Sequence, residues 1–283
     1  MFENVLVGVD GSSNGRDAIA LATRLAGHHG KLTLAHVRTG ELNPLVAMTP
    51  GLPAEEQQAS LELLERDRDD SGVQAELKSV VAASAGAGLH RLAEQLGAEL
   101  LVVGSSSRGN FGRAMLGDDT RAALNGSPCA VAIAARGYGG HDGGAGSQIT
   151  RVGAAYNRSP ESERALAVAR EVAQLSGASV AALEVVSIPA YAFSGLIAPA
   201  IGDSIDTMIS EANARMSQLP GVDGRAVYGL AGEELAAFGE DVDLLVVGSR
   251  GYGPGKRLVR GSTSDFLERH ARCSLLVLPR PAE

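Results

Sequence analysis

The sequence predicts an α/β protein of two tandem doubly wound domains, each built on a mostly parallel five-stranded sheet. Three observations support this prediction. The letters LLVVGS stand at residues 100–105 and again at 244–249, strand-like and helix-like segments alternate through both halves, and a glycine-rich stretch separates the halves. A repeat in register indicates a duplicated domain. Strands that alternate with helices are typical of a parallel sheet covered by helices on both faces.

The repeat sets the expected domain boundaries. The offset between the two LLVVGS runs also pairs Gly109 with Gly253, Arg113 with Arg257, Gly117 with Gly261, and Cys129 with Cys273. We therefore expect a first domain at residues 1–135, a flexible Gly-rich linker at 136–148 and a second domain at 149–283.

The expected elements follow from runs of apolar residues and from helix start signals. In the first domain the strands are expected at 4–9, 31–37, 73–80, 99–103 and 130–134, and the helices at 13–27, 54–70, 89–96 and 119–124. In the second domain the strands are expected at 151–156, 179–186, 225–228, 244–247 and 274–278, and the helices at 161–175, 203–219, 233–238 and from 262 onward.

Composition and charge exclude several classes of protein. Of the 283 residues, 45% are hydrophobic and 20% are charged, which is typical of a folded globular chain. The formal net charge of -8 argues against a general nucleic-acid binder, which needs a basic face. The N-terminus has too short an apolar run for a signal peptide, and no stretch has the length of a membrane span. We therefore expect a cytoplasmic protein without nucleic-acid or membrane partners.

The stretch from Leu244 to Thr263 contains the residues of a candidate anion-binding site. A buried strand ends at Gly248, a loop rich in glycine follows, and Ser262 opens a helix as its expected N-cap, with Asp265 placed as in a capping box. Glycines let backbone N–H groups approach a ligand closely, and the start of a helix favours an anion. Cations stand in the same loop, at Arg250, Lys256, Arg257 and Arg260. A surface turn would also use glycines, so the spacing has to distinguish the two interpretations.

The spacing Gly248-x2-Gly251-x9-Gly261-Ser262 resembles the phosphate loop of the universal stress protein family. The resemblance covers nearly the whole chain apart from the linker, and it implies an adenine nucleotide α-hydrolase-like fold. It also implies that the backbones of Gly248, Gly251 and Gly261, together with Ser262 and Thr263, hold the phosphates of ATP. Arg250 is expected to bridge those phosphates.

The same resemblance assigns residues at the ends of the first two strands of each domain. The family's aspartate beside the ribose or the phosphates is Asp10 in the first domain, where the alternative role is a helix N-cap. The second domain has Asn157 instead, which can bond a hydroxyl but brings no charge to a metal, so ATP is expected there with or without Mg²⁺. The backbones of Val37 and Val185 are implied to face adenine, and core packing is the alternative for both side chains.

The first domain is expected to bind ATP weakly or not at all. Its counterparts of the loop glycines are Gly104 and Gly117, but Ser107 replaces the second glycine and Asp118 stands where Ser262 stands in the second domain. A carboxylate at the start of a helix would cap the N–H groups itself and repel a phosphate.

The histidines and cysteines are expected to have structural roles. His28 and His29 are expected to interact with a helix C-terminus, and the other histidines, at 36, 90, 141 and 270, show no metal-ligand spacing. Cys129 and Cys273 are expected to be buried free thiols. No catalytic constellation can be identified, so the sequence supports a slow ATPase at most.

Two classes of function remain open at this stage. The first is an ATP-binding module for a stress response or for signalling, in which nucleotide occupancy sets a conformation or a partner interface. The second is a nucleotide-free protein-interaction scaffold of the same fold. Domains of the family pair through their last strands, so 130–134 and 274–278 are expected to pair within the chain or in a homodimer. The protein partner is not identified by the sequence.

Overall fold

A computed structural model describes residues 2–27, 30–39, 51–105, 122–140, 148–187, 198–249, 258 and 262–279. The elements of the first domain are β1 (Asn4–Gly8), α1 (Ser13–Ala26), β2 (Lys31–Arg38), α3 (Leu52–Ser71), β3 (Ala75–Val81), α4 (Ala85–Leu96), β4 (Leu100–Gly104) and β5 (Ala130–Ala134). Those of the second are β6 (Arg151–Tyr156), α6 (Pro160–Ser176), β7 (Ser179–Val186), α7 (Ala198–Met216), β8 (Asp223–Tyr228), α8 (Ala231–Phe238), β9 (Leu244–Gly248), α9 (Ser262–His270) and β10 (Ser274–Leu278).

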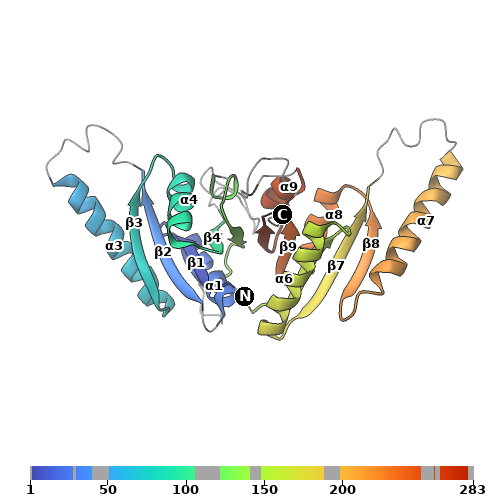
Figure 1. Ribbon diagram of the computed structural model, residues 1–283, viewed down its shortest axis with the longest axis horizontal. Helices are drawn as coiled ribbons and strands as arrows, with labels where there is room; N and C mark the ends of the chain where they lie inside the picture. The colour runs from blue at the N-terminus through green and yellow to red at the C-terminus, as the bar shows by residue number, and fades with distance from the viewer. Residues whose placement is uncertain are drawn as a thin grey trace.

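The described strands form one continuous sheet in the order β3-β2-β1-β4-β5-β10-β9-β6-β7-β8. Within each domain all strand pairs are parallel, as predicted. The two five-stranded halves join where β5 and β10 pair antiparallel, with Leu276 opposite Ala132. The expected pairing of the last strands is therefore made inside the chain, which places α3 and α7 at opposite ends of an elongated molecule (Figure 1).

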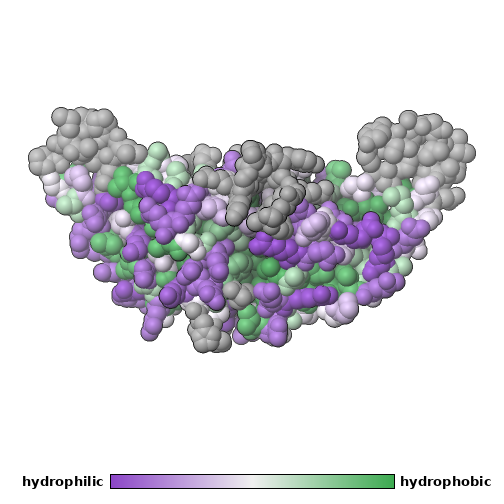
Figure 2. Space-filling model, in the orientation of Figure 1, coloured by the Kyte–Doolittle hydropathy of each residue, from purple (hydrophilic) through white to green (hydrophobic). Residues whose placement is uncertain are grey.

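Two apolar clusters cover the two faces of this sheet. One contains buried residues of α1, α3, α6 and α7, and the other contains buried residues of α4, α8 and α9. The repeated LLVVG runs are β4 and β9, and their four apolar residues are buried in both domains, as expected for central strands of a parallel sheet. In the view of Figure 2, hydrophilic residues cover most of the described surface. None of the helices in the described ranges is both long and apolar enough to cross a membrane.

Two helices begin four or more residues earlier than the sequence predicts. Helix α4 starts at Ala85 because Ser84 caps it, with the Ser84 side chain accepting a hydrogen bond from the Ala87 N–H at 3.2 Å. Helix α7 starts at Ala198, so Pro199, which precedes the expected helix at 203–219, lies in the first turn, where its missing N–H has no cost. Of the predicted helix at 119–124, the described residues 122–124 are helical.

The described residues at the start of the predicted linker are packed. The backbone N–H groups of Gly137 and Gly139 donate to the carboxylate of Asp17 in α1, at 2.8 and 2.6 Å, and Tyr138 is only 5% exposed. Just beyond the linker, in the second domain, Thr150 donates through its N–H and its hydroxyl to Asp243. The described residues at the start of the linker differ from the flexible segment that the glycine content predicts, because the Asp17 carboxylate binds their backbone donors.

Both cysteines are buried free thiols, as predicted. Burial raises the pKa of Cys129 to about 11 and that of Cys273 to about 12. Thiolate is the reactive form, and at pH 8 a thiol with a pKa near 11 is only about one part in a thousand ionised. We expect no measurable reaction of the native protein with Ellman's reagent at pH 8, and reaction of both thiols after unfolding in guanidinium chloride. A rapidly reacting thiol in the native protein would contradict the described packing.

Candidate functional site

The candidate site is a cavity of about 750 Å³ in the second domain, at the carboxyl ends of β6, β7 and β9. The strand order reverses between β6 and β9, because β7 and β8 extend the sheet on one side and β10 on the other. Ligands of doubly wound sheets bind at such a switch point. The volume lies in the range of small-molecule sites.

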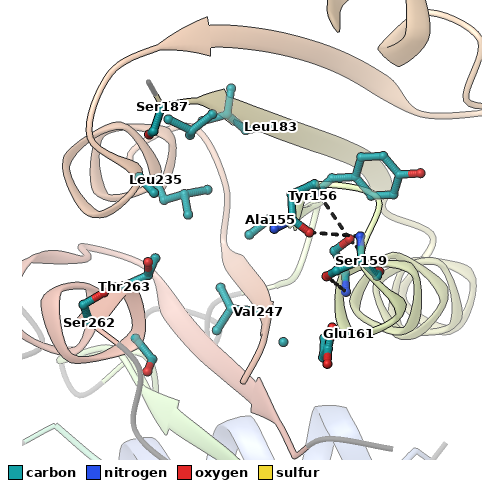
Figure 3. A pocket seen from close by; sticks show the side chains of 16 residues that line it. Ala155, Tyr156, Ser159, Glu161, Leu183, Ser187, Leu235, Val247, Ser262 and Thr263 are labelled. Atoms are coloured by element: carbon teal, nitrogen blue, oxygen red, sulfur yellow. Dashed lines mark hydrogen bonds between the residues drawn. The ribbon is translucent and has the colours of Figure 1, made fainter. Parts of the chain in front are cut away.

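The cavity combines an apolar part with a hydroxyl-bearing part. The apolar lining comes from the sheet and from α8, namely Ala155, Leu183, Val185, Leu235 and Val247. The polar lining comes mostly from the starts of α6 and α9, namely Asn157, Ser159, Glu161, Ser162, Ser262, Thr263 and Ser264, with Ser187 after β7. Figure 3 shows Ser262 and Thr263 on one side of the space and Ser159 and Glu161 on the other. Such a lining can take a ligand with a flat apolar part and several polar groups.

The structure brings together five of the residues that the sequence nominates in this domain. Asn157, Val185, Gly248, Ser262 and Thr263 all line the cavity. Arg250, Gly251 and Gly261 lie outside the described residues, as do Lys256, Arg257 and Arg260. Among the described lining residues, the one charged side chain is that of Glu161.

A hydrogen-bonded turn fixes Asn157 at the start of α6. The Asn157 Oδ1 accepts from the Ser159 N–H at 3.1 Å, and the Ser159 side chain caps the helix by accepting from the Ser162 N–H at 3.2 Å. The Asn157 N–H donates to the Ser162 hydroxyl at 3.2 Å. Because Oδ1 is engaged in this turn, the amide Nδ2 is the group that Asn157 can offer to a ligand.

The same turn in the first domain corrects one expected role of Asp10. Its carboxylate accepts from the N–H and the hydroxyl of Ser12, at 3.0 and 2.6 Å, and Ser12 caps α1. Asp10 is therefore not the N-cap; it orients the residue that is. In the second domain Arg158 occupies the position of Gly11 and keeps its left-handed backbone, with φ of 65° against 76°. That conformation is unfavourable for a residue with a Cβ, and no sequence pattern predicted it there.

The strand-end glycines have a packing role that sequence reasoning missed. A Cβ built on Gly248 would lie 2.7 Å from the Cβ and the backbone oxygen of Glu161, at the start of α6. On Gly104 it would lie 2.2 Å from the backbone oxygen of Asn14, at the start of α1. In both domains the glycine lets the first turn of a helix cross the end of the strand closely.

The start of α9 differs from the predicted capping box. Ser262 is the first residue of the helix, and the residue before it lies outside the described ranges. The Asp265 carboxylate accepts two hydrogen bonds from the Arg269 guanidinium, at 2.9 and 3.0 Å. This ion pair joins residues one turn apart on α9 and supports the helix.

The first-domain counterpart of Val185 is Val37. Val37 packs against α4, where a Cβ on Gly88 would lie 2.7 Å from its side chain. In the second domain Val185 lines the cavity. Gly117 and Asp118 lie outside the described residues.

The histidines that the structure describes have structural contacts. His36 Nδ1 lies 2.8 Å from the Ser60 hydroxyl, His90 Nε2 lies 2.6 Å from the Ala123 carbonyl oxygen, and the His270 ring stacks on Phe266. His28, His29 and His141 lie outside the described ranges. Within those ranges, no group of three or more His, Cys, Asp or Glu side chains is arranged to hold a metal ion.

Several cavity residues were not predicted. Leu235 reaches the cavity only because α8 packs over β7, and Ser187 is ordered by its hydrogen bond to the Gly229 carbonyl oxygen at 2.6 Å. Position at the carboxyl end of a strand was the available signal for Ser187. No local signal marks Leu235, because its place depends on contacts distant in sequence.

Comparisons with known proteins agree with this fold. The model of the Universal stress protein family matches residues 1–135 and 148–279. A universal stress protein of Mycobacterium tuberculosis strain H37Rv is 26% identical over 213 residues, which is 69% of each chain. One from Thermus aquaticus is 31% identical over 130 residues, covering 44% of this chain and 94% of its own.

Solved structures extend the likeness over the whole chain. A universal stress protein of Archaeoglobus fulgidus DSM 4304 has a TM-score of 0.68 at 18% identity, over 99% of both chains. A protein of Pseudomonas aeruginosa UCBPP-PA14, described as a putative universal stress protein, has a TM-score of 0.63 at 17% identity, over 98% of this chain and 94% of its own. At these identities the structures establish the fold, and the family match extends through both domains. The chain therefore belongs to the universal stress protein family.

Proposed function

We propose that this chain is an ATP-binding module of a stress response or a signalling pathway, and that the C-terminal domain holds the nucleotide. The observation that carries the proposal is the cavity at the β6–β9 switch point. Five residues nominated separately by the family resemblance, namely Asn157, Val185, Gly248, Ser262 and Thr263, line this one space.

The chemistry of the lining supports a nucleotide. The side chains of Ala155, Leu183, Val185, Leu235 and Val247 offer apolar surface to a purine base. The hydroxyls of Ser262 and Thr263 lie at the start of α9, where the helix dipole favours phosphate. The Asn157 amide can donate to a ribose hydroxyl but carries no charge for a metal, so we propose binding with or without Mg²⁺.

We further propose that the two domains have different roles. Residues 149–283 hold the nucleotide, whereas residues 1–135 form a domain with a degenerate phosphate loop. Asp118 supplies a carboxylate in the first domain where the second has Ser262. The pairing of β5 with β10 joins the two domains, so nucleotide binding in the second domain can alter the interface between them.

Calorimetric titration of the full chain with ATP, in the presence and absence of Mg²⁺, tests the proposal. We expect one site per chain. Ser262→Asp gives the second domain the carboxylate of the first, and it should weaken ATP binding about tenfold or more through repulsion of the phosphates. The chain should stay folded, because an acidic residue is favourable in the first turn of a helix. Circular dichroism and the unfolding midpoint check this.

The matched control is Ser210→Asp, which makes the same charge change at an exposed position of α7 outside the cavity lining. It should bind ATP like the unmodified chain. No heat at millimolar ATP from a folded chain would contradict the proposal and leave the nucleotide-free interaction scaffold as the interpretation.

A further inference from the structure

One backbone contact ties the second domain's phosphate-loop segment to the first domain. The Leu258 N–H donates to the Ser127 carbonyl oxygen at 2.9 Å, and the Gly126 N–H donates to the Leu258 carbonyl oxygen at 3.0 Å. Residues 126 and 127 precede β5 in the first domain, whereas Leu258 stands between Gly248 and Ser262, which both line the cavity. We call Gly126, Ser127 and Leu258 the interdomain clamp.

Both sides of the clamp are firmly held. Leu258 is 1% exposed and belongs to the apolar cluster that also contains Leu124 of the first domain and Leu267 of α9. Ser127 is fully buried, and its hydroxyl donates to the Cys129 carbonyl oxygen at 3.0 Å. A buried pair of backbone hydrogen bonds of this kind resists displacement, because breaking it leaves polar groups without water.

The clamp lies close to the cavity along the chain. Only three residues lie between Leu258 and Ser262, so the chain between them spans at most about 14 Å. A shift of Leu258 must therefore change the range of positions open to the start of α9. In the repeat register, the residue of the first domain that corresponds to Leu258 is Ala114, whose side chain is far smaller.

We propose that Gly126 and Ser127 of the first domain are positioning residues for the nucleotide cavity of the second domain. The first domain then serves as the support for Leu258 and, through it, for the start of α9. Because linkage is reciprocal, nucleotide in the cavity strengthens the clamp by the same factor by which the clamp strengthens nucleotide binding. The inference rests on the proposed ATP site, and it assigns to the degenerate domain a role in that site.

Gly126→Ala tests the clamp from the first domain alone. Gly126 has φ of +90°, which a residue with a Cβ rarely adopts, and the nearest atom to an added Cβ is His90 Cε1 at 3.9 Å. The substitution therefore shifts the backbone without a steric clash, and it should move the Gly126 N–H away from Leu258. We expect calorimetry of the full chain to give an ATP affinity about tenfold lower.

Gly97→Ala is the matched control. Gly97 also has positive φ, 60°, with no atom within 4 Å of an added Cβ, and it lies at the end of α4 in the same domain. It should destabilise the chain by a similar amount and leave ATP affinity unchanged. Equal affinity of the Gly126→Ala and unmodified chains would overturn the proposal.

Hydrogen exchange of the unmodified chain gives a second test, which does not depend on whether a variant folds. With saturating ATP, the Gly126 amide should exchange about tenfold more slowly, or slower still, whereas the Ala98 amide, bonded to the Ala93 carbonyl oxygen at 2.9 Å, should not change. Heat from ATP binding without protection of Gly126 would overturn the clamp alone. Absence of heat from ATP would overturn the proposed function, and the clamp with it.

Discussion

Gly104→Ala is expected to lower the free energy of unfolding by about 3 kcal/mol or more. The added methyl group would lie 2.2 Å from the backbone oxygen of Asn14 and 2.6 Å from its carbonyl carbon. Neither atom can move by rotation of a side chain, so α1 itself must shift away from β4. Guanidinium chloride unfolding, monitored by circular dichroism, gives the loss as a shift in the midpoint.

Gly15→Ala is the control for this substitution. It adds the same methyl group one residue after Asn14, where the nearest atom is Val9 Cγ1 at 3.2 Å, and alanine is the better helix former. We expect its free energy of unfolding to differ from that of the unmodified chain by less than about 1 kcal/mol. Equal midpoints for Gly104→Ala and the unmodified chain would show that the close crossing of β4 and α1 is absent.

Arg215→Ala is expected to cost about 3 kcal/mol, because it leaves a buried carboxylate without its partner. The Arg215 guanidinium in α7 lies 3.3 Å from Glu184 Oε1, and Glu184 in β7 is only 6% exposed. Because the Arg215 side chain is 39% exposed, the expected loss lies at the low end of the range for a broken buried ion pair. The measurement is again the unfolding midpoint at neutral pH.

Two further variants make this prediction specific to the buried charge. Glu184→Leu in the Arg215→Ala chain should recover most of the lost stability, since apolar groups replace a buried ion pair at little cost. Arg272→Ala removes a pair with Glu240 in which both side chains are about half exposed, 55% and 53%, and should cost less than about 1 kcal/mol. A double variant no more stable than Arg215→Ala would mean that the loss arises from packing of the Arg215 stem.

The sequence predicts the fold because its strongest signals are local and repeated. The buried runs of β4 and β9 and the recurrence of LLVVGS determine the parallel half-sheets and their duplication. The family resemblance nominated Asn157, Val185 and Gly248 at the ends of three strands, and strand ends in such a sheet meet at one edge. Their shared cavity follows from that topology.

Features that depend on contacts distant in sequence escaped prediction. The glycine at 104 reads as part of a phosphate loop, and only the crossing of α1 over β4 reveals its packing role. Arg158 lies in the turn between Asn157 and Ser159, where the first domain has Gly11, and this turn requires its left-handed backbone. The contact of Leu258 with residues 126 and 127 uses backbone atoms, which leave no trace in the sequence.

Because β5 and β10 belong to one chain, their antiparallel pairing does not depend on protein concentration, as the association of separate subunits does. When two paired elements belong to one chain, their effective concentration is set by the connection between them and is unaffected by dilution. The effective concentration of one half for the other is therefore the same in dilute and in concentrated solutions of the protein. Because the two halves are separate parts of one chain, a substitution in one half leaves the other unchanged. In a homodimer, the same substitution would appear in both subunits.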